Sequence, residues 1–327
     1  ILMMLSTSLL AFWISNTSST VMMLPLALGM LALVKKDAVT SEAKFLMLGI
    51  AYSANIGGIA TMVSSPPNAI GAALLGITFF EWLKYGIPMF LFTFPLMVVL
   101  LTLYFKPDKK LTVEQVAITS SVDGPNKTLG AIFLLTITLW LMEGVLAPLL
   151  GIKEGFSSIV AVIAIFLIVI TRVLHWEDVI KSIQWNVLLL FGGGLTLAML
   201  LDTSGLGALL ATQISLFATA MPLIAFIWII VLTSILFTEF MSNTASAALF
   251  LPIVYTLAVE LKINPALLVL PATLAASYGF MLPVGTPPNA LVFATGFIPQ
   301  KDMLRVGVIL NVLFSIILTL FFFVIFH

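Results

Sequence analysis

The tripeptide Ser15-Asn16-Thr17 lies inside an otherwise apolar stretch, and the same three residue types return as Ser242-Asn243-Thr244 in a second apolar stretch. Another polar interruption follows each tripeptide further along the chain. It reads Ser64-Ser65-Pro66-Pro67-Asn68 in the first case and Gly285-Thr286-Pro287-Pro288-Asn289 in the second. The sequence therefore contains an internal repeat, and each copy interrupts apolar sequence twice.

The composition is that of an integral membrane protein. Hydrophobic residues make up 61% of the 327 residues, charged residues make up 9%, and the mean hydropathy is +1.21. In soluble globular domains about a quarter of the residues carry charge. Apolar runs of spanning or near-spanning length recur, and the alternating pattern of a membrane barrel is absent. We therefore expect an all-α protein within the lipid bilayer, because helices satisfy their own backbone groups there.

Scarce residue types exclude several classes of function. The chain has no cysteine and only two histidines, which excludes disulfides, thiolate metal sites and a histidine metal cluster. The formal net charge is zero, so we expect no nucleic-acid partner. No nucleophile, histidine base or metal cluster accompanies the two tripeptides, and the sequence therefore predicts that the protein is not an enzyme.

Each copy of the repeat predicts a re-entrant helical hairpin followed by a broken transmembrane helix. Serine and asparagine favour helix N-caps, so each tripeptide should start the second arm of its hairpin. The paired prolines should break the helix in which they lie. A short arm and a separate last helix should follow each broken helix. The expected segments are hairpins at 1–34 and about 222–260, a second broken helix at about 266–298, arms at Phe79–Tyr85 and Lys301–Arg305, helices near 128–150 and 156–171, and a helix from Trp185 that the glycines at 192–194 interrupt.

The two copies also define the expected parts of the chain. The tripeptides align at an offset of 227 residues, which becomes 221 from the second interruption onward. We expect the visible part of the first repeat at residues 1–105, a cytoplasmic loop between the repeats at 106–127 and the second repeat at 128–327. About a hundred residues of the second copy have no counterpart in the first. We therefore expect N-terminal helices to precede Ile1.

The basic residues predict the orientation in the membrane. If the hairpins re-enter and the broken helices cross, eleven basic residues share one side and three lie on the other. The positive-inside rule places the larger group in the cytoplasm and makes the two repeats inverted, in a multi-pass protein of the inner (cytoplasmic) membrane. The larger group is Lys35, Lys36, Lys44, Lys106, Lys109, Lys110, Lys127, Arg172, Lys181, Lys301 and Arg305, and the smaller group is Lys84, Lys153 and Lys262.

Inverted repeats with hairpins and interrupted helices are typical of secondary transporters whose site lies near the bilayer midplane. A break in a membrane helix leaves backbone groups that cost several kcal/mol each unless a ligand, an ion or water satisfies them. N-terminal helix ends suit an anion, whereas free carbonyls with Asn and Ser oxygens suit a hard cation. An ion channel is the alternative from another class, but hairpins that close from opposite sides favour alternating access.

Two stretches resemble signatures of the divalent anion/sodium symporter family, the bacterial relatives of the sodium-dependent dicarboxylate and citrate carriers. They are Thr238-Glu239-Phe240 with the second tripeptide, and the run within residues 276–292. The resemblance covers essentially the whole chain. It implies a homodimeric, elevator-type carrier that moves C4 dicarboxylates, such as succinate, malate or fumarate, together with Na⁺. A sodium-independent dicarboxylate exchanger and a sodium/sulfate symporter of the same family are the alternatives.

The resemblance also implies which residues bind the cargo. Substrate carboxylates would meet Ser15, Asn16, Thr17, Ser65, Pro66, Ser242, Asn243, Thr244, Thr286 and Pro287. One sodium ion would lie at Ser15, Asn16 and Ser64, and the other at Thr238, Ser242, Asn243 and Gly285. Thr238 matches Ala11 in the repeat, so the first sodium site would have one side-chain oxygen fewer.

Charge raises two further questions about the predicted site. Neither tripeptide and neither Pro-Pro-Asn stretch contains Lys, Arg or His. Helix dipoles and bound cations would then have to compensate a dianion, so we expect at least two sodium ions for each substrate. Glu239 lies three residues before Ser242 and matches Phe12. It is either a coupling or proton site or a carboxylate held by nearby donors, and we favour the second interpretation.

Overall fold

The computed structural model describes residues 1–33, 40–107, 127–152, 155–183, 185–206, 209, 212–214 and 221–326. The helices of its first part are α1 (Leu2–Ala11), α2 (Asn16–Leu33), α3 (Ser41–Gly57), α4 (Pro66–Leu75) and α5 (Phe79–Phe105). The central part contains α6 (Lys127–Leu141), α7 (Glu143–Leu149), α8 (Phe156–Ile170), α9 (Trp176–Ser182) and α10 (Trp185–Thr203). The last part contains α12 (Leu223–Phe240), α13 (Asn243–Glu260), α14 (Pro265–Ala275), α15 (Pro287–Ala294) and α16 (Gln300–Phe326).

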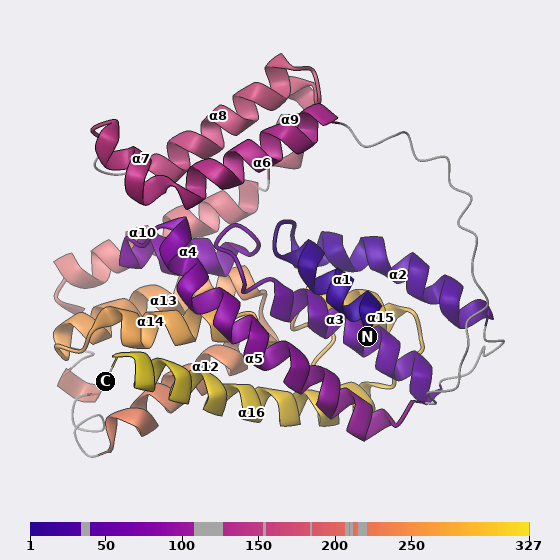
Figure 1. Ribbon diagram of the computed structural model, residues 1–327. Helices are drawn as coiled ribbons and strands as arrows, with labels where there is room; N and C mark the ends of the chain where they lie inside the picture. The colour runs from indigo at the N-terminus through magenta and orange to yellow at the C-terminus, as the bar shows by residue number, and fades with distance from the viewer. Residues whose placement is uncertain are drawn as a thin grey trace.

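The architecture is all-helical over the described ranges, which contain no strand. Four helices are long and apolar enough to cross a membrane, namely α5, α12, α13 and α16, and the bent pair α6–α7 gives a fifth span if it counts as one. The prediction of an all-α membrane protein is therefore confirmed for these residues. Figure 1 shows α1–α5 and α12–α16 in one bundle, with α6–α9 grouped together at the top of the view.

The two sets of five helices, α1–α5 and α12–α16, have the same hydrogen bonds at their breaks. The Asn68 side-chain Nδ2 donates to the carbonyl oxygens of Gly58 and Thr61, each at 2.8 Å. Asn289, 221 positions later, donates to the two carbonyl oxygens at the same spacing, at 2.8 and 3.0 Å. A buried asparagine thus satisfies carbonyls that the interrupted helix leaves free.

The last helix of each set crosses its own break at a glycine. A Cβ added to Gly86 would lie 2.6 Å from the carbonyl oxygen of Ile59 and 2.5 Å from that of Ala60. A Cβ added to Gly307 would meet the carbonyl oxygen of Phe280 in the same way. Such distances are below van der Waals contact, so only glycine lets helix and break approach this closely.

Helices α5 and α16 lie side by side and run antiparallel. Tyr85, near the start of α5, stacks on Phe326, at the end of α16, with ring centroids 6.0 Å apart. Towards the other end, Tyr104 of α5 and Ile309 of α16 line the same hollow. These helices occupy matching places in the two sets.

The two sets interlock through the half-helices that follow the breaks. α4 packs on α13 and α14, and α15 packs on α2 and α3. Buried side chains join the sets: the Tyr52 hydroxyl donates to the Phe280 carbonyl at 2.8 Å, and Asn55 Nδ2 donates to Thr286 Oγ1 at 3.0 Å. Each half-helix therefore lies on the hairpin of the other set, and the starts of α2, α4, α13 and α15 come together.

The prediction that glycines 192–194 interrupt a helix is wrong. α10 runs without interruption through this stretch. A Cβ added to Gly194 would lie 2.7 Å from the carbonyl oxygen of Ala248, so this glycine lets α10 pack closely on α13. The helix predicted near 128–150 is also not straight, because α6 and α7 meet at a bend of 77°.

The prolines were predicted to break their helices, but the breaks lie before the prolines. α3 ends at Gly57 and α14 at Ala275, whereas α4 and α15 begin at Pro66 and Pro287. Proline is tolerated in the first turn of a helix because the N–H that it lacks would have no helical partner there. The Pro-Pro-Asn stretches therefore start helices.

The predicted arms are not separate elements. Phe79–Tyr85 continues into the following helix, and so does Lys301–Arg305, which gives α5 and α16 27 residues each. A glycine inside a helix costs only about 1 kcal/mol relative to alanine. Gly86 and Gly307 therefore do not end these two long apolar helices. Most of the predicted loop at 106–127 lies outside the described residues, since only Lys106, Pro107 and Lys127 fall within them.

The crossing at Gly307 gives a first prediction. Gly307→Ala should destabilise the fold by about 1–3 kcal/mol, because the added methyl group forces α16 away from the second break. Gly29→Ala is the matched control, since a Cβ there has no neighbour within 4 Å. The measurement is the apparent Tm of the purified full chain in detergent. Equal Tm values for the two variants would contradict the close crossing.

Candidate functional site

The four helix starts enclose a cavity of about 190 Å³. Both tripeptides and both breaks contribute to its wall. The lining residues are Ser15, Asn16, Thr17, Asn55, Ser64, Ser65, Pro66, Leu190, Ser242, Asn243, Thr244, Pro287 and Pro288. The structure thus brings together all but one of the residues predicted to meet substrate. The exception is Thr286, which does not line the cavity and is 1% exposed.

Helix ends give this cavity its electrostatic character. α2, α4, α13 and α15 all begin at its wall; the first N–H groups of α2 and α13 have no helical partner, whereas α4 and α15 begin with two prolines that carry no N–H. Each helix start carries a partial positive charge of about half a unit. None of the described residues that line the cavity is charged. The arrangement therefore suits an anion, held by backbone N–H groups and small hydroxyl groups.

The serines of the tripeptides cap their helices, as the sequence analysis predicted. The hydroxyl oxygens of Ser15, Ser242 and Thr286 each accept a hydrogen bond from the backbone N–H three residues later, at 3.2, 3.2 and 3.3 Å. A hydroxyl oxygen that accepts one such bond keeps a second lone pair and its own hydrogen. Capping therefore orients the hydroxyl groups of Ser15 and Ser242 and leaves them able to contact a ligand, whereas Thr286 Oγ1 also accepts from Asn55 Nδ2 and has both lone pairs occupied.

A cluster of oxygen atoms lies beside the second tripeptide. The Thr238 hydroxyl is 2.6 Å from one terminal atom of the Asn243 amide, assigned as Oδ1, and 2.7 Å from the carbonyl oxygen of Ala276. The same amide atom is 3.3 Å from the carbonyl oxygens of Ala276 and Gly285. With its nitrogen at this position, the amide donates hydrogen bonds to these oxygens. With its oxygen there, four oxygens converge, which is a donor set that a hard cation takes.

This cluster contains three of the four residues predicted for the second sodium ion, namely Thr238, Asn243 and Gly285. The hydroxyl of the fourth, Ser242, caps α13 instead. Ala276 is an additional member that the sequence analysis missed. It contributes a backbone carbonyl, and a backbone group leaves no mark on residue type.

The matching place beside the first tripeptide is poorer in oxygen atoms. The Asn16 amide lies against Gly58, where a Cβ would clash with it. Its Oδ1 is buried and has no hydrogen-bond partner within the described part of the chain. The Ser64 hydroxyl donates to the carbonyls of Gly58 and Thr61, at 2.6 and 2.7 Å. Ala11 brings no hydroxyl to this place, so the difference between the two copies persists in three dimensions.

Asn55 is a cavity residue that the sequence analysis did not identify. It is fully buried in α3, and its Nδ2 donates to Thr286 Oγ1 of the other set. Its Oδ1 has no hydrogen-bond partner among the described residues. An amide is costly to bury, so an asparagine within an apolar helix is the feature of the sequence that could have indicated a functional residue here. Asn55 thus joins the first set to the second break at the wall of the cavity.

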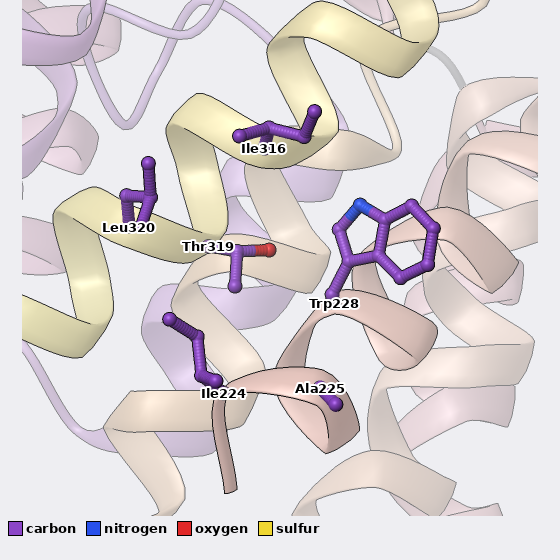
Figure 2. Close-up of a pocket in the computed structure, with 6 residues that line it drawn as sticks. All are labelled: Ile224, Ala225, Trp228, Ile316, Thr319 and Leu320. Atoms are coloured by element: carbon purple, nitrogen blue, oxygen red, sulfur yellow. The ribbon is translucent and has the colours of Figure 1, made fainter. Parts of the chain in front are cut away.

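A second hollow, of about 220 Å³, has a different character. It is a groove between α12 and α16 lined by Ile224, Ala225, Trp228, Ile316, Thr319 and Leu320 (Figure 2). The Trp228 indole N–H is already bonded to Ser315 Oγ at 3.0 Å. The groove includes the first turn of α12 but offers no convergent polar groups. Its lining is almost entirely apolar, so it lacks the polar groups that would hold a charged ligand.

Comparison with known proteins places the whole chain among transporters. The sequence signature described as "Sodium:sulfate symporter transmembrane region" matches residues 1–326. An uncharacterized transporter of Haemophilus influenzae is 40% identical over 326 residues, which cover 97% of this chain and 70% of the relative. An uncharacterized transporter of Methanocaldococcus jannaschii is 37% identical over 98% of this chain and 72% of its own. A sodium-dependent dicarboxylate transporter of Staphylococcus saprophyticus is 32% identical over 97% of this chain and 67% of the relative.

The oxygen cluster gives a second prediction. Thr238→Val keeps the side-chain shape and removes one of the four oxygens. In a titration of the apparent Tm with sodium, the half-maximal sodium concentration should therefore be roughly tenfold higher than in the wild type. Choline replaces sodium to hold the ionic strength constant. Thr233→Val is the control, because that exposed hydroxyl only bonds the Ile229 carbonyl within α12. A sodium response unchanged in Thr238→Val would remove this residue from the cation site.

Proposed function

Because the chain belongs to the family of sodium:sulfate symporters, the divalent anion/sodium symporters, we propose that it carries a C4 dicarboxylate together with Na⁺ across the cytoplasmic membrane. Membership makes the protein a membrane transporter and not an enzyme. Succinate, malate and fumarate are the proposed substrates. The observation that carries the proposal is the single cavity at which four helix starts and an oxygen cluster meet.

The arrangement of the helix starts supports a dicarboxylate. α2 and α4 come from the first set, and α13 and α15 come from the second. The cavity therefore has two pairs of N-termini, and a dicarboxylate has two carboxylates separated by a carbon chain. A relative that carries the name of a sodium-dependent dicarboxylate transporter agrees with this choice. Sulfate is the second candidate because the family description names it, but it concentrates its charge on one centre.

Charge compensation supports coupling to sodium. Each helix start contributes about half a positive charge, so four starts barely match a dianion. The described cavity lining contributes no charged side chain. We therefore assign at least two sodium ions to each dianion, one at Ser15, Asn16 and Ser64 and one at Thr238, Asn243 and Gly285. Rotation of the Asn243 amide would exchange its nitrogen for its oxygen when an ion enters.

The ends of three helices support the proposed inverted orientation. Lys44, at the start of α3, forms an ion pair of 2.6 Å with Asp302, at the start of α16. Lys106 follows α5 at the end where antiparallel α16 begins, and Lys84 lies near the opposite end. Lys44, Lys106 and the basic residues of the first turns of α16 therefore belong to one side, which we assign to the cytoplasm.

The grouping of helices supports an elevator-type mechanism. The interlocked sets form one bundle, whereas α6 packs mainly on α8 and meets the bundle at α5 and at Trp13, whose ring lies against that of Phe133. Figure 1 shows this separation of α6–α9 from the bundle. We propose that the bundle carries the site across the membrane, that α6–α9 belong to the stationary scaffold, and that the transporter is a homodimer.

The proposed coupling gives a third prediction. Succinate should bind the purified full chain in sodium, and binding should fall at least about tenfold when choline replaces sodium, since an uncompensated charge at the midplane costs a few kcal/mol. Isothermal titration calorimetry measures both conditions, and sulfate serves as the competing anion. Full-affinity succinate binding in choline would instead favour a sodium-independent exchanger. Tighter binding of sulfate than of succinate would favour the sulfate symporter.

The position of Asn55 gives a fourth prediction. Asn55→Asp keeps the shape and places a negative charge at the cavity wall, so succinate affinity should fall by roughly tenfold or more. Asn264→Asp is the matched control, because Asn264 caps α14 at an exposed position and aspartate caps equally well. Succinate titration in saturating sodium compares the two. An unaffected affinity in Asn55→Asp would place the substrate elsewhere.

A further inference from the structure

Glu239 is a buried carboxylate to which the proposed transport site assigns no role. It lies in the last turn of α12, three residues before Ser242, and is fully buried. Its oxygens accept hydrogen bonds from Met281 N at 2.8 Å, Leu282 N at 2.9 Å and Asn311 Nδ2 at 2.6 Å. All three partners are donors. This arrangement fits an ionised carboxylate, which only accepts.

The carboxylate satisfies backbone groups that the second break exposes. Residues 276–286 lie between α14 and α15; the first three still donate their N–H groups to carbonyl oxygens of α14, but those further along have no continuous helix to bond to. Two of these groups donate to Glu239, and Asn311 of α16 donates the third hydrogen bond. A buried carboxylate costs several kcal/mol unless such donors surround it. Glu239 therefore ties together α12, the second break and α16.

The same break supplies carbonyl oxygens to the cluster at Asn243. Gly285 lies directly against Glu239, since an added Cβ would be 3.0 Å from Oε2 and 3.5 Å from the Glu239 Cα. Thr238, the preceding residue, supplies the hydroxyl of the cluster. The negative charge thus lies next to two of the four oxygen donors, the Gly285 carbonyl and the Thr238 hydroxyl.

The first set of helices has an apolar pair at the matching place. Glu239 matches Phe12 at the offset of 227, and Asn311 matches Phe90 at the offset of 221. The rings of Phe12 and Phe90 pack edge to face with centroids 4.8 Å apart. One junction between matching helices is therefore a charged, hydrogen-bonded pair, and the other is an aromatic pair.

The first break is held at this junction without a charge. Thr61, which matches Leu282, donates its hydroxyl to the carbonyl oxygen of Phe12 at 2.5 Å. Leu282 donates its N–H to the Glu239 side chain instead. The fold can therefore fasten a break to the preceding hairpin helix with uncharged groups alone. Holding the break to the hairpin helix therefore does not by itself require the charge of Glu239.

We propose that Glu239 is a positioning residue and a fixed counter-charge for the sodium ion at Thr238, Asn243 and Gly285, which makes the two sodium sites unequal. The inference rests on the proposed function. A nearby negative charge stabilises a cation and repels an anion until the cation has bound. The second site therefore holds Na⁺ more tightly than the first, where the matching pair is aromatic. Sodium at the second site is then a precondition for a dianion in the shared cavity.

Two single variants separate charge from shape. Glu239→Gln keeps the side-chain length and loses the charge, whereas Glu239→Asp keeps the charge and is one methylene shorter. Each purified full chain is titrated with sodium against choline, with the apparent Tm as the readout, and sodium activation of succinate uptake into proteoliposomes is measured in parallel. We expect Gln to raise the half-maximal sodium concentration about tenfold or more and Asp to raise it less. The reverse order would reduce Glu239 to a structural role and overturn the proposal.

A double variant tests the same point with a junction that the chain already uses. Glu239→Phe combined with Asn311→Phe reproduces the aromatic pair of Phe12 and Phe90. We expect its Tm without sodium to fall, because the N–H groups of Met281 and Leu282 lose their acceptor, while the half-maximal sodium concentration rises as in Glu239→Gln. Wild-type sodium dependence in this variant would overturn the proposal. If a single variant does not fold, the double variant carries the comparison.

The wild-type protein in the same assays separates this inference from the proposed function. A wild type without sodium-dependent stabilisation or uptake would overturn the symport proposal itself, whatever the variants do. A sodium-dependent wild type whose response is unaltered in the uncharged variants would overturn only the role of Glu239.

Discussion

The free backbone groups at two interrupted membrane helices are the constraint on which the rest of this structure depends. Each N–H or C=O left without a partner in the hydrocarbon region costs several kcal/mol. The protein answers with buried side chains at fixed places: Asn68 and Asn289 bond carbonyls of both breaks, and Glu239 bonds two N–H groups of the second. The carbonyls and helix starts that remain face the cavity, where cargo can satisfy them.

Interlocking of the two sets follows from the same constraint. A half-helix such as α4 or α15 is too short to cross the membrane alone, so its start must be buried against protein. Each packs on the hairpin of the other set, which gathers four positive helix ends around one space. Glycines at matching positions allow the approach, since Gly86 and Gly307 leave no room for a Cβ. The proposed anion site and the tight packing therefore follow from one arrangement.

The two copies share a frame but differ in the groups that surround the cavity. Thr238 and Glu239 stand where the first copy has Ala11 and Phe12, and Asn311 stands where it has Phe90. These differences all gather at the second oxygen cluster, because α12, the second break and α16 meet there. The two copies therefore give the two ends of the cavity different surroundings, which is the basis of the proposed difference between the two sodium sites.

The sequence by itself determined the membrane class, the repeat and most residues of the cavity, because composition, recurrence and helix-capping preferences are properties of residue type. It misplaced the breaks and the arms, since the Pro-Pro-Asn stretches start helices and the glycines near 86 and 307 do not end them. Only the tertiary structure decided that Asn55 faces the cavity and that the Ala276 carbonyl joins the oxygen cluster. The physical reason is that backbone carbonyls carry no sequence signature, and that the partner of a buried amide or carboxylate is set by how helices far apart in the chain pack together.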